Sequence, residues 1–167
     1  MKLTIERAAL LKSLGHVQSV VERRNTIPIL SNVLIEAKGD RVSLTATDMD
    51  LAIVEHTAAE VAGAGAATVP AHMLYDIVRK LPEGAQVQLE LAGDGSQVAI
   101  KAGRSRFTLQ TLPKEDFPST ASGDLPHRFP LSAVDLRSLI DHTRFAISTE
   151  ETRYYLNGIY LHAHSSG

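Results

Sequence analysis

The sequence predicts an α+β fold in which antiparallel sheets carry helices on one face. The first observation behind this prediction is a unit that recurs along the chain, and the second is a set of short hairpin signals between its copies. Each copy predicts a strand, a helix and then about three antiparallel strands. Strands joined by short hairpins and interrupted by single helices are typical of an α+β layout.

The repeated unit is visible in three segments, which begin at Ile5, Val69 and Leu131. In each segment a short strand-like end leads into apolar residues at helical spacing. The corresponding apolar positions are Leu10, Leu74 and Leu136, followed by Leu14, Val78 and Ile140. An alternative is that any protein built from strands and helices shows such similarity between its segments by chance.

The first and third copies also match beyond their helices. Residues 30–33 fall on residues 156–159, Ile35 falls on Leu161, and Ala37 falls on Ala163. The third copy therefore predicts a second strand in this matching stretch after its helix, in addition to the short strand before its helix.

Strand signals fill the stretches between the predicted helices. Alternating or β-rich runs cover residues 30–36, 41–47, 51–57, 87–91, 97–101 and 106–111. Turn residues separate them at Lys38-Gly39-Asp40 and at Gly93-Asp94-Gly95, which predicts two hairpins.

The prolines and glycines around residues 113–128 interrupt this pattern and indicate a boundary. We predict a first domain of two repeat units over residues 1–121 and a linker over residues 122–128. Residues 129–167 then form the start of a second domain, which is incomplete.

Composition excludes several classes of protein. The hydrophobic fraction of 44% is enough for a core, and the absence of cysteine excludes disulfides and thiolate metal sites. No apolar run is long enough for a membrane span, and residues 1–7 lack the apolar part of a signal peptide, so we expect a cytoplasmic protein without a membrane partner. The net charge of −2 indicates that any contact with DNA is local and weak.

The first predicted helix has two distinct faces. At 100° per residue its apolar side carries Leu10, Leu14, Val17 and Val21. Its polar side carries Lys12, His16, Ser19 and Arg23 and no carboxylate, which suits attraction to phosphates. The alternative is an ordinary solvated face.

The sequence offers little for catalysis or cofactor binding. Gly63-Ala64-Gly65 lacks the rest of a nucleotide-binding fingerprint. Asp48 and Asp50 are compatible with Mg²⁺ but also with a turn, and His162 and His164 lack the further ligands that zinc requires. We therefore predict no cofactor, no metal site and no enzymatic activity.

Seven short motifs, taken together and in order, carry a resemblance to a known family. They are Arg24-Asn25-Thr26-Ile27-Pro28-Ile29-Leu30, Leu44-Thr45-Ala46-Thr47-Asp48, Thr68-Val69-Pro70-Ala71, Leu81-Pro82-Glu83-Gly84-Ala85, Gly103-Arg104-Ser105-Arg106-Phe107, Leu112-Pro113 with Asp116-Phe117-Pro118, and Arg153-Tyr154-Tyr155-Leu156-Asn157-Gly158. Over essentially the whole chain the sequence resembles the N-terminal part of the bacterial β sliding clamps, the processivity subunits of DNA polymerase III.

This resemblance implies a DNA-clamp fold with helices on the inner face of a ring and antiparallel sheets on the outer face. It implies a non-catalytic homodimeric ring that encircles double-stranded DNA without sequence preference. It also implies that replicative polymerase subunits and the clamp loader bind through short linear peptides. The alternative function is a module that binds peptides at a sheet edge and never meets DNA.

The resemblance assigns DNA contacts to Arg24, Tyr154 and Tyr155, and the polar face of the first helix adds Lys12 and Arg23. Arginine pairs with phosphate oxygens and aromatic rings stack on exposed bases. Packing on a core is the alternative for the tyrosines. Glu150 repels phosphate and so opposes contact at that loop.

Two further surfaces follow from the resemblance alone. Arg153 and Leu156 match positions that border the groove for partner peptides. The face that joins the neighbouring subunit is assigned to Ile77, Leu81, Arg104, Arg106, Phe107 and Leu109. The alternative for this face is a solvent-exposed edge strand that its arginines keep from pairing.

Overall fold

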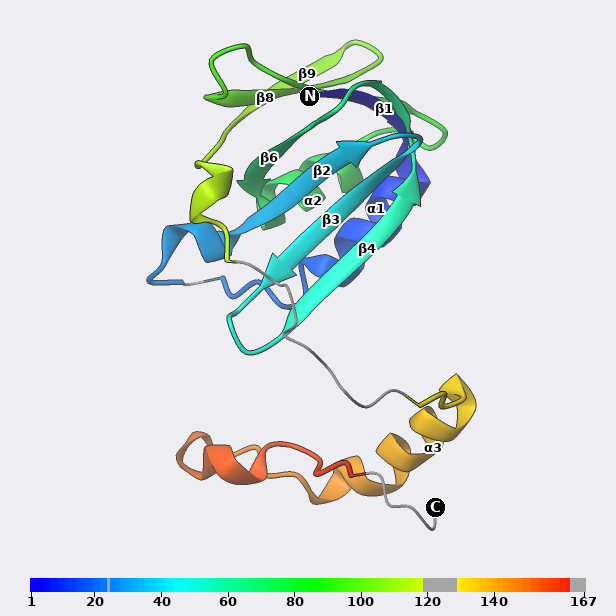
Figure 1. Cartoon of the computed structure of the whole chain (residues 1–167), viewed down its shortest axis with the longest axis vertical. Helices are drawn as coiled ribbons and strands as arrows, with labels where there is room; N and C mark the ends of the chain where they lie inside the picture. Colours follow the sequence, from blue (N-terminus) through cyan, green and yellow to red (C-terminus); the bar gives the residue numbers. More distant parts are fainter. Residues whose placement is uncertain (24, 119–128, 163–167) are drawn as a thin grey trace. The chain divides into compact units, whose positions relative to one another are not determined.

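The computed structural model of the chain describes residues 1–23, 25–118 and 129–162. The chain divides into two compact units, Met1–Ala121 and Ser122–Gly167 (Figure 1). None of the helices in these described ranges is long and apolar enough to cross a membrane.

The first unit contains two copies of the predicted repeat. The first copy consists of β1 (Lys2–Glu6), α1 (Arg7–Val17), β2 (Asn32–Lys38), β3 (Arg41–Thr47) and β4 (Ala52–Ala58). The second copy consists of β6 (Gly65–Pro70), α2 (Ala71–Lys80), β7 (Gln86–Leu91), β8 (Gln97–Ala102) and β9 (Ser105–Gln110). A short strand β5 (Glu60–Gly63) and the 3₁₀ helices η1 (Pro28–Ser31) and η2 (Lys114–Asp116) complete the unit. The prediction of strand, helix and three strands is confirmed for both copies.

Each of the two sheets combines strands from both copies. The five-stranded sheet has the order β5-β1-β7-β8-β9, and the four-stranded sheet has the order β4-β3-β2-β6. In the first sheet Ile5 lies opposite Val87, and in the second Val69 lies opposite Val33. The first strand of each copy therefore pairs with the strand that follows the helix of the other copy. This reciprocal pairing makes the two copies one folding unit, since neither copy completes its sheet alone.

Turn residues fix the two hairpins where the sequence predicts them. Gly39 and Gly95 adopt φ values of 65° and 73°, in the left-handed region that glycine tolerates. In the second hairpin the Ser96 amide and hydroxyl donate to the Asp94 carboxylate. These hydrogen bonds hold the pKa of Asp94 below its ordinary value.

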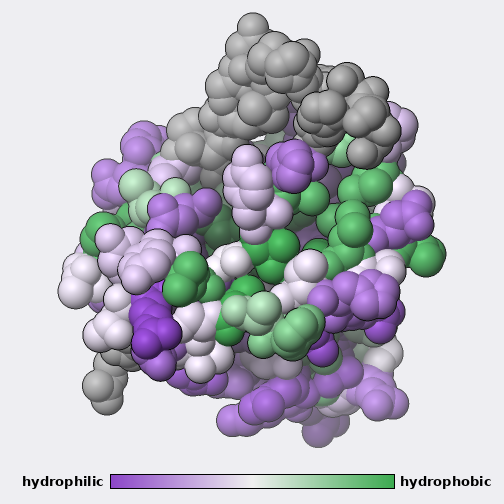
Figure 2. Space-filling model, turned by 90° about the horizontal axis from the view of Figure 1, so that it is seen from below, coloured by the Kyte–Doolittle hydropathy of each residue, from purple (hydrophilic) through white to green (hydrophobic). Residues whose placement is uncertain are grey.

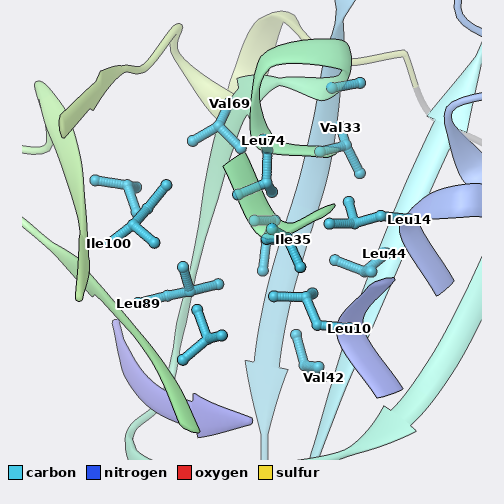
Figure 3. Close-up of a cluster of buried hydrophobic side chains, with 14 of the residues drawn as sticks. Leu10, Leu14, Val33, Ile35, Val42, Leu44, Val69, Leu74, Leu89 and Ile100 are labelled. Carbon is cyan, nitrogen blue, oxygen red and sulfur yellow. The ribbon is translucent and has the colours of Figure 1, made fainter. Parts of the chain in front are cut away.

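The core is shared by the helices and by both sheets. Figure 3 shows side chains from α1, α2 and strands of both sheets pointing toward one another, and Leu10, Leu14, Ile35, Leu74 and Ile100 among them are fully buried. The two helices cover one face of the four-stranded sheet (Figure 1). Hydrogen bonds also join the two helical segments. The Arg7 guanidinium at the start of α1 donates to the carbonyls of Val78 and Arg79 near the end of α2. At the start of α2, His72 forms a hydrogen bond of 2.8 Å with the carbonyl of Val21, which follows α1.

One strand of the first unit is not predicted from the sequence. Residues 60–63 carry no strong strand signal, yet β5 pairs with β1 and places Val61 opposite Leu3. This strand continues almost directly from β4 but belongs to the other sheet. Its hydrogen-bonding partner determines its conformation, so local sequence does not reveal it.

The second unit contains α3 (Ala133–Thr143) and the 3₁₀ helices η3 (Arg144–Ala146) and η4 (Glu151–Leu156). The predicted helix is confirmed, but the strands predicted before it and in the matching stretch after it are wrong for the described residues 129–162. A strand requires a hydrogen-bonding partner, and this part of the unit provides none. Ala163 lies outside the described residues.

Apolar side chains of the second unit remain in contact with solvent. Val134, Tyr160 and Leu161 are 77%, 86% and 59% exposed, and Figure 2 shows exposed apolar groups among polar ones on one face of the molecule. Over residues 129–162 this unit therefore has the helix of the repeat without a sheet that covers it.

Candidate nucleic-acid interface

Helix α1 displays a polar face because Leu10, Leu14 and Val17 turn into the core on the other side. The Glu6 carboxylate accepts a hydrogen bond from the Ala9 amide at 3.2 Å, so the helix begins at Arg7. Leu10 and Leu14 are fully buried, whereas Lys12 and His16 on the opposite side are exposed. The prediction of which face is buried is confirmed.

The helix is shorter than its predicted polar face. Ser19 and Arg23 are predicted to continue the helical stripe, but α1 ends at Val17. The amide of Ser19 bonds the His16 carbonyl and that of Val21 bonds the Gln18 carbonyl, so the spacing tightens to three residues and closes the helix. Ser19 and Arg23 lie in this exposed turn segment rather than on the helix.

Three basic residues are predicted to contact DNA at this surface, and the structure describes two of them, Lys12 and Arg23. Lys12 and Arg23 are exposed, and neither forms an ion pair with any of the residues that the structure describes. Both are therefore available to phosphate oxygens. Arg24 lies outside the described residues.

A carboxylate reaches the polar face of α1 from another element. The Oε1 atom of Glu55 on β4 lies 2.7 Å from Nδ1 of His16. The prediction that this face has no carboxylate is correct for the residues of the helix itself. It is wrong for the folded surface, because β4 lies beside α1 and contributes Glu55.

The two tyrosines of the second unit lie on η4. Tyr154 and Tyr155 are 74% and 71% exposed, and their rings meet edge to face with centroids 5.7 Å apart. The alternative of packing on a core is not realised in the described part of this unit. Both rings are accessible to a ligand.

Arg153 and Leu156, assigned to the peptide groove, lie on the same short helix as the tyrosines. The Arg153 guanidinium pairs with Glu150 at 2.9 Å, and Leu156 is 48% exposed. The Leu156 carbonyl also accepts a hydrogen bond from the Ser148 amide at 2.8 Å, which folds the segment back on itself. Glu150 therefore faces a cation of its own loop.

The residues assigned to the joining face lie on α2 or directly after it, and on β9 or in the turn before it, where β9 is the last strand of the five-stranded sheet. Ile77 and Phe107 line a groove of about 520 Å³ together with His72, Met73 and Ser105. The fold thus brings together positions that are thirty residues apart in the sequence.

The remaining joining-face residues divide into surface and support. Arg104 and Arg106 are exposed in the turn before β9 and on β9 itself. Leu81 and Leu109 are only 5% and 4% exposed, so their side chains pack in the core and support the face from below. Strand β9, which has one unpaired edge among the described strands, therefore carries Arg106 and Phe107 at the surface and Leu109 in the core.

No metal centre is found within the described parts of the chain, where no group of three or more histidine, cysteine, aspartate or glutamate side chains converges. The Asp48 carboxylate accepts hydrogen bonds from the amides of Asp50 and Leu51, at 3.0 and 2.7 Å. This geometry favours the turn-forming interpretation of Asp48 and Asp50. His164 lies outside the described residues.

The chain is similar in sequence and in structure to known proteins of one family. The family model for the DNA polymerase III beta subunit, N-terminal domain, matches residues 1–121. The chain belongs to this family. The match covers both repeat copies of the first unit, including α1, α2 and β9.

Relatives extend the similarity across the whole chain. The "Beta sliding clamp" of Caulobacter vibrioides (strain NA1000 / CB15N) is 60% identical over 167 residues, which are 100% of this chain and 45% of the relative. This chain thus spans less than half the length of the clamp relatives that it matches.

Solved structures of the family share the fold. A Caulobacter crescentus beta sliding clamp, with polyethylene glycol bound to a putative beta-motif tethering region, matches with a TM-score of 0.92 and 62% identity over 97% of this chain and 43% of that one. A sliding clamp from Bartonella birtlesii bound to griselimycin matches with a TM-score of 0.92 and 54% identity over 99% of this chain and 44% of that one. The predicted α+β clamp fold is therefore confirmed.

Proposed function

We propose that this chain is part of a DNA polymerase processivity factor, a ring-shaped sliding clamp that encircles duplex DNA. In this proposal the protein is cytoplasmic, tethers the replicative polymerase and catalyses no reaction. The observation that carries the proposal is similarity along the full chain to relatives named as beta sliding clamps. Because the chain spans 45% of such a relative, the function belongs to the complete ring.

The mechanism of a clamp is topological, since an encircled duplex cannot leave a closed ring. Contacts with DNA then need to be few, solvated and independent of sequence, because each strong phosphate contact slows sliding. In this proposal Lys12, Arg23 and Arg24 approach phosphates, and Tyr154 and Tyr155 touch the duplex. The exposure of Lys12 and Arg23 and of both tyrosine rings supports these roles.

The proposed ring closes when the joining face of one subunit meets its neighbour in a homodimer. Ile77, Phe107, Arg104 and Arg106 provide the surface, and Leu81 and Leu109 support it. The unpaired edge of β9 supports strand-to-strand joining, which satisfies backbone groups on both sides. Polymerase subunits and the clamp loader bind the ring through their own short linear peptides, in a groove bordered by Arg153 and Leu156.

A chimera tests this proposal directly. Residues 1–167 replace the matching part of the Caulobacter vibrioides clamp, to which they are 60% identical. The chimera is loaded by the Caulobacter clamp loader onto nicked circular DNA, and retention is measured before and after linearisation. The unmodified Caulobacter clamp is the control.

We expect the chimera to stay on the circle and to leave the linear form by sliding off its ends. Equal retention on both forms would contradict a topological mechanism.

In the same assay we expect Arg24→Ala to slow loading at low salt without changing the thermal unfolding of the chimera. An unchanged loading rate would remove Arg24 from the proposed contacts.

A further inference from the structure

Glu55 faces the helix layer because of its place in the four-stranded sheet. Directly paired residues of neighbouring strands share one face, and Ile35, Leu44 and Glu55 form such a row. Ile35 and Leu44 are fully buried under the helices, so Glu55 ends a core-facing row at the last strand of the sheet.

The next row along the same strands faces the other way. Glu36, Ser43 and His56 are paired in the same manner one residue along each strand. Since successive side chains alternate between faces, Glu36 lies on the side of the sheet opposite to α1. The sheet therefore carries two carboxylates, one on each face.

The Glu55 carboxylate is held at α1 by His16. Its Oε1 atom accepts the imidazole Nδ1–H at 2.7 Å, and the two side chains are 31% and 53% exposed. Among the described residues neither side chain has another ion-pair partner within 4.0 Å. Lys12 is one helical turn before His16, on the same face.

This pair changes the charge that α1 presents. With a neutral imidazole the pair carries one negative charge, and with an imidazolium it carries none. In both states it adds no positive charge to the face that displays Lys12. A carboxylate within a few ångströms of such a face lowers the attraction between that face and a phosphate backbone.

We propose that Glu55 is an affinity-limiting residue of the DNA-facing surface, which keeps the contact between α1 and duplex phosphates weak. This inference rests on the proposed sliding-clamp function and adds a residue that opposes tight binding. A weak inner contact suits a ring that holds DNA by closure and moves along it.

The test is a nuclear magnetic resonance titration of the isotopically labelled 167-residue chain with a short mixed-sequence duplex at low salt and neutral pH. Wild type is compared with Glu55→Gln, which keeps an acceptor for His16 and removes the charge. Glu36→Gln is the matched control, because it makes the same change in net charge on the opposite face of the same sheet. Lys12→Gln sets the scale for losing one cation from the helix.

We expect Glu55→Gln to lower the Kd for the duplex about two- to threefold, the size expected for one charge a few ångströms from the phosphates in water. Shifts should concentrate on α1 amides, Glu36→Gln should match wild type, and Lys12→Gln should raise the Kd by a similar factor. Equal effects of Glu55→Gln and Glu36→Gln, or no shift of α1 amides in any variant, would overturn the inference.

Failure of this inference differs from failure of the proposed function. The retention of the chimera on nicked circles depends on ring closure and not on Glu55. A chimera that is retained on circles while Glu55→Gln leaves duplex binding unchanged would remove only the role of Glu55.

Discussion

Helices α1 and α3 occupy equivalent positions in the repeat but have opposite environments. Both contain eleven residues, and Leu10 and Leu14 of α1 correspond to Leu136 and Ile140 of α3. The α1 residues are fully buried, whereas Leu136 and Ile140 are 36% and 40% exposed. The same periodic pattern thus places apolar side chains on one stripe in both helices. A sheet buries that stripe in the first unit, and no sheet does so among the described residues of the second.

Local signals do not explain this difference. Ser132 caps α3 by accepting the Asp135 amide at 3.1 Å, while its hydroxyl donates to the Asp135 carboxylate at 2.8 Å. Helix α1 has a less favourable cap, the Glu6 side chain. The better-capped helix is the more exposed one, so tertiary packing and not capping separates the two units.

The largest predicted effect is a difference in stability between variants at two equivalent leucines, Leu10 of α1 and Leu136 of α3. We expect Leu10→Ala to lower the free energy of unfolding of the first unit by about 2–5 kcal/mol, because it leaves a cavity in a close-packed core. Leu136→Ala should change it by less than about 0.5 kcal/mol. Urea unfolding of the 167-residue chain, followed by circular dichroism, measures both. Similar losses for the two variants would show that α3 is packed as tightly as α1.

A second prediction compares two threonines. The buried Thr68 hydroxyl accepts from Asn32 and from the Leu112 amide, and donates to the Leu112 carbonyl at 2.7 Å. We expect Thr68→Val to cost about 1–3 kcal/mol, because buried partners lose their hydrogen bonds. Thr143→Val, which removes an exposed hydroxyl bonded to Leu139, is the control.

The same urea titration measures this pair. The control should leave the unfolding midpoint of the first unit unchanged. A Thr68→Val variant as stable as wild type would mean that water satisfies the Leu112 backbone groups without cost.

A third prediction concerns the cap of α3. We expect Ser132→Ala to destabilise this helix by about 1 kcal/mol, because the Asp135 amide loses its acceptor. Amide hydrogen exchange should become faster in α3 and remain unchanged in α1. Unchanged exchange in α3 would indicate that contacts other than the cap hold the helix.

The smallest predicted effect is a pH dependence in the first unit. Hydrogen bonds and charges from Lys101 and Lys2 hold the pKa of Glu90 below its ordinary value of 4.5. Since the folded state favours the carboxylate, this contribution is present above that value and is lost as the pH falls through the lowered pKa. Glu90→Gln should therefore flatten the acid side of the thermal stability profile slightly. A profile identical to wild type would show that these exposed pairs contribute nothing measurable.

Much of the first unit follows from the sequence because its signals are local. Glycines at the two hairpin tips and alternation along the strands predict the hairpins, and helical spacing predicts which side of α1 is buried. The end of α1 and the strand β5 do not follow, since non-local packing and a hydrogen-bonding partner decide them. The strands predicted in the second unit fail for the same reason within its described residues.

The candidate site divides in the same way. Helical periodicity alone predicts that Lys12 and His16 are exposed. Periodicity does not reveal that Glu55 reaches His16, because the two residues lie on different elements nearly forty positions apart. The alternation of β4 is the one sequence signal that could have placed Glu55 on the side of the helices.

By itself the sequence determined the repeat, the family resemblance and the faces of the helices, because these depend on the order and spacing of side chains along one element. Only the tertiary structure decided that the first strand of each copy pairs with a strand of the other copy, that Ile77 meets Phe107 in one groove, and that a carboxylate joins the polar face of α1. These features depend on which elements lie side by side, and contacts between distant segments form only when the whole unit folds.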